Sequence, residues 1–334
     1  MSGAALESRS GQVLEDRWTI ETKLGAGGMG EVWRARDREG KSAAIKLLRT
    51  ELVDTPDMFA RFRQEVDAAS RLGHPHIIEV LGFGHTRAGR PYYAMEFLDG
   101  PDLLAMLKAK GPMPWRRAFA LAEQICSALH AAHQAGIIHR DVKPENFVLI
   151  EDEAVHGRDF VKVLDFGIAK LTDPELAAIE TRTGVNVGTP EYMAPEQCEG
   201  HVLDARVDVY GVGVLLYQLV VGKPPFEGAD EYEILGKHVH ERPVPPSEAR
   251  PDAGVPKMVD AVILQALEKD REHRFADMQR FARSLAAARG REHEIPVVDA
   301  SPGSARARGR AWMMPAMVGV VALAAVIGVL LAIT

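Results

Sequence analysis

The chain carries the segment IHRDVKPEN at residues 138–146 and, after a short insertion, the tripeptide DFG at residues 165–167. These stretches place two acidic residues, Asp141 and Asp165, and one amide, Asn146, at fixed spacing. A site that transfers a phosphoryl group from ATP needs little covalent help. It must supply a carboxylate that aligns the attacking hydroxyl, and oxygen atoms that hold Mg²⁺. The three side chains can supply these groups, whereas either tripeptide alone would be a chance match or a turn.

A glycine-rich run, LGAGGMGEV, lies upstream at residues 24–32 and has the spacing GxGxxGxV. Glycines lack side chains, so the backbone of such a run can close over phosphate groups. The same spacing occurs in dinucleotide-binding folds, where the glycine loop opens a helix. Here the next residues, EVWRARD, have the β-branched and aromatic composition of a strand. This favours a strand–turn–strand and argues against a dinucleotide-binding fold.

Lys46 ends the apolar strand Ala43-Ala44-Ile45-Lys46. An isolated lysine at such a place would be an edge residue that faces water. After a glycine-rich run, however, a cation can hold the α- and β-phosphates if a carboxylate fixes its ammonium group. Glu65, in a helix predicted over residues 57–72, is the preferred carboxylate. Glu51 and Asp67 are the alternatives.

With these motifs in this order, the chain resembles the protein kinase family, and specifically bacterial kinases of the eukaryotic serine/threonine type. The resemblance covers about residues 17–288. It implies an α+β, two-lobed protein-kinase fold that binds ATP and Mg²⁺ between the lobes. The small β-rich N-lobe is expected at about 17–98 and the larger helical C-lobe at about 99–288.

The resemblance also assigns roles within the site. Asp141 would be the catalytic base, Lys46 would pair with Glu65, and Asn146 and Asp165 would bind Mg²⁺. The run YAMEFL at residues 93–98 resembles the hinge, with a gatekeeper methionine followed by backbone groups that meet adenine. The residues implied to contact ATP are Leu24, Gly25, Gly27, Gly28, Gly30, Val32, Ala44, Lys46, Met95, Glu96 and Leu98.

Residues outside the phosphate site complete the resemblance. The segment Gly188–Glu196 looks like the substrate-side segment that ends in APE. Asp208 matches a structural aspartate beneath the catalytic loop, and Arg274 matches the arginine that pairs with Glu196. Specificity for serine and threonine is inferred from Lys143, two residues after the catalytic aspartate, and from the GTPEY sequence. Lys143 could neutralise charge on the moving phosphoryl group.

Regulation is predicted from Arg140, which directly precedes the catalytic aspartate. In this family such an arginine commonly binds a phosphothreonine of the activation loop. Among the candidates in this loop, Thr181 and Thr183 are preferred over Thr172 and Thr189. A phosphate adds about −1.5 to −2 charges near neutral pH, which is enough to order a loop against an arginine.

Composition excludes other classes of protein. The formal net charge is −7, and acidic and basic residues are mixed along the chain, so no basic surface for a nucleic acid is expected. The two cysteines, Cys126 and Cys198, lie far apart without Cys/His partners at metal-binding spacing, which argues against a disulfide framework or a structural zinc site.

The C-terminal residues 311–334 contain no charged side chain, and residues 312–334 are predicted to form a transmembrane helix. About 22 residues at ~1.5 Å each span roughly 33 Å, enough for the ~30 Å hydrocarbon layer. Residues 289–311 read as a juxtamembrane linker and residues 1–16 as a flexible N-terminus. Arginines before the span predict a single-pass protein of the cell membrane with a cytoplasmic kinase domain. Small residues spaced by four in the span could support a homodimer.

Two functions of different class follow from these patterns. One is an active, membrane-anchored signalling kinase that phosphorylates serine and threonine in protein substrates and is activated by autophosphorylation. The other is a membrane-tethered pseudokinase scaffold that binds nucleotide without turnover. The sequence favours the enzyme, because every residue expected to touch phosphate or metal is present.

Overall fold

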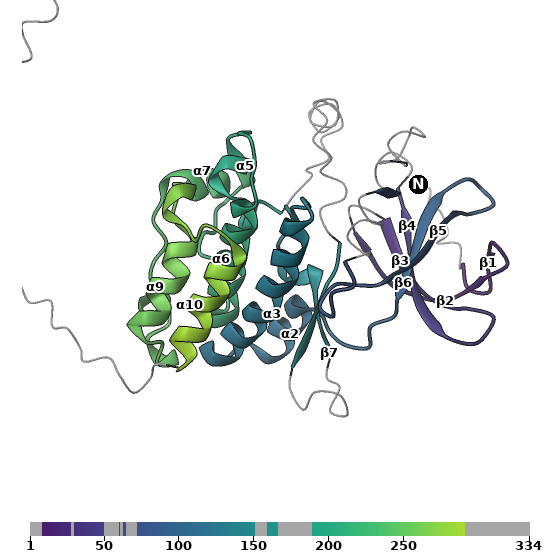
Figure 1. Ribbon diagram of the computed structural model, residues 1–334, viewed down its shortest axis with the longest axis horizontal. Coiled ribbons are helices and arrows are strands. Elements are labelled where there is room, and N and C mark those ends of the chain that lie inside the picture. Colours follow the sequence, from purple (N-terminus) through teal and green to yellow (C-terminus); the bar gives the residue numbers. More distant parts are fainter. Residues whose placement is uncertain are drawn as a thin grey trace, which may run out of the picture. The chain divides into compact units, whose positions relative to one another are not determined.

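The computed structural model shows a lobe of strands beside a lobe of helices (Figure 1). The N-lobe is one antiparallel sheet of six strands in the order β1-β2-β3-β4-β6-β5. The residues that the structure describes are 9–27, 30–49, 60, 63–64, 72–150, 159–165 and 189–290. The strands are β1 (Val13–Leu14), β2 (Trp18–Gly27), β3 (Gly30–Arg36), β4 (Ser42–Leu48), β5 (Val80–His85) and β6 (Pro91–Glu96).

The turn between β3 and β4 shows how local sequence sets the strand register. Asp37 accepts hydrogen bonds from the backbone N–H groups of Glu39 and Lys41 at 2.9 and 2.8 Å, and this closes the DREGK turn. From that turn the two strands pair without a bulge, from Arg36 opposite Ser42 to Gly30 opposite Leu48. β3 and β4 therefore form a regular hairpin.

The sheet has two faces with different partners, because successive side chains of a strand point to opposite sides. One face packs into a small cluster of its own, which includes Trp18, Ile45 and Tyr92. The other face contributes Ala44, Tyr93 and Met95 to the large core that extends through the C-lobe. The second face therefore presents the N-lobe residues of the site to the C-lobe.

Residues 9–16, the described part of the N-terminal segment that was expected to be flexible, include strand β1, whereas residues 1–8 lie outside the described residues. Val13 and Leu14 pair with Thr19 and Trp18 of β2, and Leu14 is only 2% exposed. Two residues are too short to show an alternating pattern, so the sequence alone did not reveal this strand.

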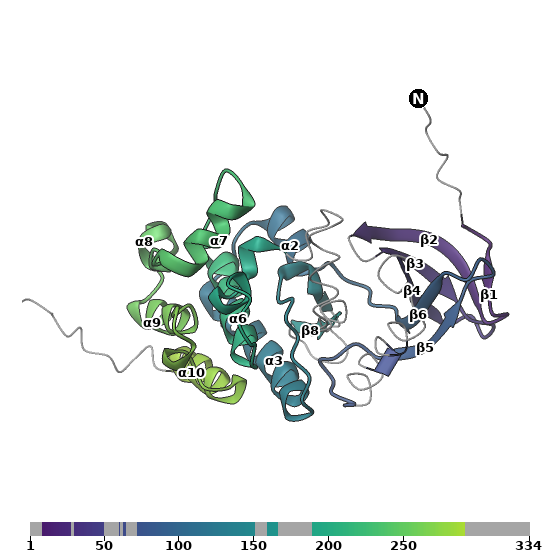
Figure 2. The same cartoon turned by 90° about the horizontal axis from the view of Figure 1, so that it is seen from above.

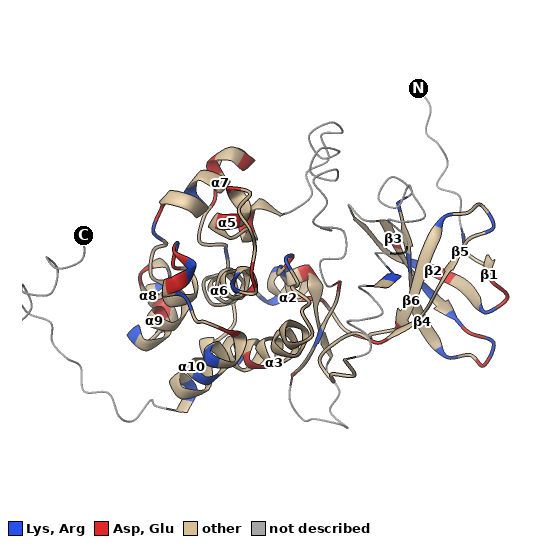
Figure 3. Ribbon diagram, turned by 45° about the horizontal axis from the view of Figure 1, so that its top comes forward, with Lys and Arg blue, Asp and Glu red and all other residues tan. Residues whose placement is uncertain are grey.

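The C-lobe is built around α6 (Arg206–Val221), which is buried on all sides and carries few charges (Figure 3). A helix that is apolar all round requires a complete shell of neighbours. The view in Figure 2 shows α10 running beside α3, and these two helices are in contact. The other α-helices in the described part of the chain are α2 (Leu103–Lys110), α3 (Trp115–Gln134), α5 (Pro195–Cys198), α7 (Glu231–His240), α8 (Pro246–Ala249), α9 (Lys257–Ala266) and α10 (Met278–Gly290).

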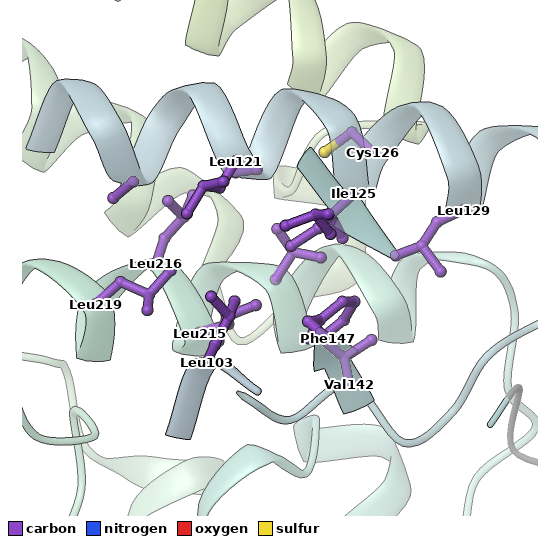
Figure 4. Packing of buried hydrophobic residues seen from close by; sticks show 14 of the residues in the cluster. Leu103, Leu121, Ile125, Cys126, Leu129, Val142, Phe147, Leu215, Leu216 and Leu219 are labelled. Atoms are coloured by element: carbon purple, nitrogen blue, oxygen red, sulfur yellow. The ribbon is translucent and has the colours of Figure 1, made fainter. Parts of the chain in front are cut away.

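The central packing joins α3 to α6 (Figure 4). Leu121, Ile125 and Leu129 follow one another at helical spacing on α3, form part of its apolar stripe and are fully buried. They lie near Leu215 of α6 and Phe147, which follows the catalytic loop. The catalytic loop is thus anchored directly on the core.

A short hairpin in the C-lobe was not expected from the sequence. Strands β7 (Phe147–Ile150) and β8 (Phe160–Val163) form an antiparallel two-stranded sheet. Val163 also forms a bridge with Ile77, which lies just before β5. This hairpin directs the chain from the catalytic loop to Asp165 and ties both to the N-lobe.

Within the described part of the chain, no helix is long and apolar enough to cross a membrane. Residues 312–334, the predicted span, lie outside that part. So do residues 291–311 of the predicted linker and most of the helix predicted over 57–72.

Candidate active site

Within the glycine-rich run, Gly25 and Gly27 lie in β2 and Gly30 begins β3. Gly30 has φ of 147°, and a side chain there would collide with the backbone carbonyl of Leu47, so packing alone requires this glycine. Gly25 and Gly27 are different, because a Cβ atom on either would meet nothing within 4 Å. The open space beside these two glycines fits a backbone that a phosphate-bearing ligand approaches closely.

Strand pairing brings four of the predicted ATP-binding residues, Val32, Ala44, Lys46 and Met95, together on one face of the sheet. Val32 lies opposite Lys46, and Ala44 lies opposite Met95. Met95 is buried, with 6% of its surface exposed, whereas Leu24 at the rim is 49% exposed. The register therefore produces a short apolar surface that ends at the Lys46 ammonium group.

Lys46 reaches from this face to the C-lobe, where it forms an ion pair with Oδ2 of Asp165. Its side chain is only 8% exposed. The hydroxyl of Tyr93 donates to Oδ1 of the same carboxylate at 2.6 Å. Burial alone would raise the pKa of Asp165, but the charge and hydrogen bond of Lys46, with the hydrogen bond of Tyr93, outweigh it and lower the pKa. This carboxyl is therefore held in its ionised form.

The catalytic loop holds its own polar groups in place. Oδ2 of Asp141 lies 2.8 Å from the Lys143 ammonium and accepts a hydrogen bond of 3.1 Å from Nδ2 of Asn146. Nδ2 of Asn146 also donates to the backbone oxygen of Asp141 at 2.7 Å. Because its nitrogen makes these contacts, the oxygen of the Asn146 amide is the atom suited to bind a cation. The backbone oxygen of Asn146 accepts from Leu164 at 2.8 Å, which links the loop to Asp165.

Asp208 supports the catalytic loop from α6. Its two carboxylate oxygens accept from the backbone N–H groups of His139 and Arg140, each at 2.8 Å. Arg140 has φ of 61°, a left-handed conformation that is uncommon outside glycine, so the two bonds stabilise a strained turn. Burial acts to raise the pKa of Asp208, but its hydrogen bond with His133 and its other partners lower it. His139 is fully buried, and its Nε2 lies 2.9 Å from the backbone oxygen of Leu164.

A second buried ion pair fixes the segment that ends in APE. Arg274 donates to both carboxylate oxygens of Glu196 at 2.7 Å each, and its side chain is fully buried. The predicted partners therefore meet although 78 positions separate them.

The family model "Protein kinase domain" matches residues 18–285. The chain belongs to the protein kinase family.

Several relatives are bacterial serine/threonine-protein kinases. The chain is 44% identical over 279 residues to pkn3 of Myxococcus xanthus, with 83% of this chain and 51% of that protein covered. It is 42% identical over 266 residues to PknB of Mycobacterium tuberculosis strain H37Rv, with 78% and 41% covered. The kinase chain thus spans about half the length of the curated relatives it matches.

Solved structures that superpose on this chain support its membership of the protein kinase family. The PknI kinase domain of Mycobacterium tuberculosis superposes with a TM-score of 0.63 at 28% identity and covers 83% of this chain and 98% of that one. Rad53 residues 1–466, in complex with AMP-PNP, superposes with a TM-score of 0.64 at 25% identity and covers 80% and 64%. The two-lobed kinase fold expected from the sequence is confirmed.

Several predicted site residues of this kinase lie outside the described residues. They are Gly28 of the glycine-rich run, Glu65 as the partner of Lys46, Phe166 and Gly167 of DFG, and the activation-loop residues Thr181 and Thr183. The pairing of Lys46 with Glu65, and of Arg140 with a phosphothreonine, therefore stays a prediction.

Two contributors to the kinase site were missed from the sequence. The sequence marks Tyr93 only as part of the hinge strand, although a polar tip in an apolar strand signals a buried partner. No sequence motif marks Lys162 of β8. It donates to Oε1 of Glu96 at 2.6 Å and to the backbone oxygen of Ile77 at 3.2 Å. Glu96 also donates its backbone N–H to Glu79, so its carbonyl is the group that could meet adenine.

The donor set suits Mg²⁺ bound together with a nucleotide. Among the residues that the structure describes, no group of three or more His, Cys, Asp or Glu side chains could hold a metal ion. Mg²⁺ needs fewer protein ligands when substrate phosphates and waters complete its octahedral shell. One carboxylate, Asp165, and one amide oxygen, Asn146, are oxygen ligands of the kind that Mg²⁺ prefers.

Proposed function

We propose that this chain is a serine/threonine protein kinase that transfers the γ-phosphoryl group of ATP to hydroxyl groups of proteins. The observation that carries the proposal is the convergence of Lys46 from β4, Asp165 after β8, and Asp141 from the catalytic loop. The charge of Asp141 is close enough to act on the pKa of Asp165. A base, a cation and a metal-binding carboxylate therefore lie within one site.

Each of these side chains has a task that its surroundings support. Asp141, oriented by Asn146 and Lys143, would accept the proton of the substrate hydroxyl and align its oxygen for attack. Lys46 would neutralise charge on the nucleotide phosphates, and Asn146 and Asp165 would hold Mg²⁺. When bound, Mg²⁺ supplies charge compensation for the phosphoryl group.

Specificity for serine and threonine rests on Lys143 and on the names of the relatives. Lys143 lies against the carboxylate of Asp141, where a cation can offset charge that develops near the attacking hydroxyl. The relatives pkn3 and PknB are named serine/threonine-protein kinases. The AMP-PNP bound by Rad53 supports an adenine nucleotide as the cofactor.

The direct test is radiolabel transfer from ATP to a generic protein substrate, followed by phosphoamino-acid analysis. We expect Mg²⁺-dependent label on serine and threonine. Label that is absent from wild type, with nucleotide binding retained, would favour the membrane-tethered pseudokinase scaffold instead. Label on tyrosine alone would contradict the assigned specificity.

We further propose activation by autophosphorylation of Thr181, Thr183 or both. The support is the position of Arg140 beside the catalytic aspartate, since an arginine is a strong partner for a phosphate group. The double alanine variant is expected to be far less active than wild type. Mass spectrometry of the active enzyme that finds residues 170–196 unmodified would contradict this proposal.

We also propose that residues 312–334 anchor the protein in the cell membrane, with the kinase domain in the cytoplasm. The supports are the uncharged stretch and the three arginines, Arg306, Arg308 and Arg310, that precede it. A reporter that is active only outside the cytoplasm should work when fused after Thr334 and fail when fused before Met1. Recovery of the full-length chain in the soluble fraction would contradict the anchor. A homodimer through the span would appear as crosslinking between spans.

A further inference from the structure

The side chain of Tyr93 lies deep in the molecule, at the meeting of the two lobes. It is 2% exposed, and its hydroxyl donates to Oδ1 of Asp165 at 2.6 Å. The two residues are 72 positions apart in the sequence and belong to different lobes. A tyrosine in this position therefore links the N-lobe sheet directly to the carboxylate that would bind the metal.

The strand register explains why this contact is specific. Tyr93 of β6 is the direct cross-strand partner of Lys46 of β4, so both side chains leave the same face of the sheet side by side. The Lys46 ammonium lies 6.0 Å from the centre of the Tyr93 ring. Lys46 binds Oδ2 of Asp165 and Tyr93 binds Oδ1, so a pair of adjacent residues holds both oxygens of one carboxylate.

The backbone of Asp165 makes this support useful. Asp165 has φ of 39°, in the left-handed region that non-glycine residues rarely adopt. A metal ligand that rotates freely loses conformational entropy when it binds the ion. The carboxylate of Asp165 must therefore be held in one orientation. Each carboxylate oxygen has two lone pairs, so Oδ1 can accept from Tyr93 and still bind a cation. Outer hydrogen bonds of this kind fix the direction of a metal ligand.

We infer that Tyr93 is a positioning residue for the metal ligand Asp165, and that its hydroxyl sets the orientation in which this carboxylate binds Mg²⁺ with the nucleotide. The inference rests on the Mg²⁺ site proposed above. Loss of a hydrogen-bond partner behind a metal ligand typically weakens metal binding by about 10- to 100-fold. Tyr93 acts through Asp165 and touches neither phosphate nor metal.

The chain offers a matched control in the adjacent residue, Tyr92. Tyr92 is also buried, at 1% exposed, but it belongs to the cluster on the opposite face of the sheet. Its hydroxyl interacts with Glu15 of the N-terminal segment and not with the site. Tyr92→Phe and Tyr93→Phe therefore remove the same atom from neighbouring positions of one strand, and only the second alters the environment of Asp165.

The experiment measures metal binding apart from turnover. Full-length wild type, Tyr93→Phe and Tyr92→Phe are saturated with AMP-PNP, and Mn²⁺ is added while free Mn²⁺ is followed by electron paramagnetic resonance. We expect Tyr93→Phe to raise the Mn²⁺ dissociation constant about tenfold. Tyr92→Phe and the affinity for AMP-PNP without metal should stay unchanged. In transfer assays, the Mg²⁺ concentration for half-maximal rate should rise more than the rate at saturating Mg²⁺ falls.

Two results would overturn the inference. One is a Mn²⁺ affinity of Tyr93→Phe that equals that of Tyr92→Phe. The other is an equal loss of AMP-PNP affinity without metal, which would indicate a merely structural tyrosine. Wild type that binds AMP-PNP but no Mn²⁺ would instead refute the proposed metal site, and this inference with it. Tyr93→Met serves as a second variant, and it should reproduce the metal defect if the phenylalanine variant does not fold.

Discussion

The catalytic loop and strand β6 both serve the site, but they are held by contacts of different range. In the loop, the side chains of Lys143 and Asn146 both bind Asp141 within six consecutive residues. In β6, Tyr93 binds Asp165, which is 72 positions away. The contacts that orient the base can therefore form within one short segment, whereas those that orient the metal-binding carboxylate form only when the lobes meet.

This difference explains which parts of the site are visible in a sequence. Short-range polar contacts require particular residue types at fixed spacing, and such spacing leaves a motif. A contact between distant segments requires only a residue of suitable length on the correct face of a strand. Many residues satisfy that condition, so no motif results.

The largest expected effects are on the rate of phosphoryl transfer. They come from removing a charged group of the catalytic loop or of the contact between the lobes. Asp141→Asn, in the loop, and Asp165→Asn or Lys46→Met, which break the contact between lobes, should each lower phosphoryl transfer by about a thousandfold or more. The fold should remain intact by circular dichroism. Asp252→Asn, at a side chain that is 80% exposed, is the matched control. Wild-type rates in a purified site variant would remove that residue from the site.

The next largest effect concerns stability and the pair formed by Glu196 and Arg274. Glu196→Gln leaves a buried guanidinium without its charge partner, so the free energy of unfolding should fall by about 3–5 kcal/mol. Urea denaturation of the two proteins measures this loss. The exposed pair of Lys223 and Glu227 provides the control, since Glu227→Gln should change stability by less than about 0.5 kcal/mol. Equal losses of unfolding free energy in the two variants would contradict the expectation that the buried ion pair contributes more to stability than the exposed one.

Asp208 tests the long-range support of the otherwise local catalytic loop. Its pKa is lowered in the folded chain, so its contribution to stability is complete above the ordinary carboxyl pKa of about 4 and is lost as the pH falls through the folded-state value. Asp208→Asn should cost about 2–3 kcal/mol near neutral pH. The difference in the free energy of unfolding between wild type and variant should be constant from about pH 7 to 5 and should narrow only below about pH 4. If this difference narrows between pH 7 and 5, a titratable group other than Asp208 causes the change.

The smallest expected effect is that of Lys162, which ties β8 to the hinge residue Glu96. Both side chains are partly exposed, at 15% and 25%, so Lys162→Met should lower stability by only about 1 kcal/mol. We expect a slightly higher dissociation constant for AMP-PNP, measured by calorimetry. The double variant with Glu96→Gln should lose little more stability than either single variant, because the two residues act on the same contact. Fully additive losses of stability would show that the two residues act independently.

Much of the fold was predictable because its signals are periodic. The hairpin around the DREGK turn follows from alternation and turn chemistry, and α3 follows from its apolar stripe. The β1 strand and the β7–β8 hairpin were not predicted. They are too short to carry a period, and neighbouring segments rather than their own propensities stabilise them.

For the site, the sequence by itself determined the residue types: the glycine-rich run, Lys46, the catalytic loop and Asp165. It could do so because phosphoryl transfer demands particular groups in a particular order. Only the tertiary structure decided that Tyr93 and Lys46 would share the carboxylate of Asp165, and that Lys162 would hold Glu96. The register between β4 and β6 and the position of the β7–β8 hairpin set these contacts. Both result from packing between segments far apart in the chain, which local sequence patterns do not encode.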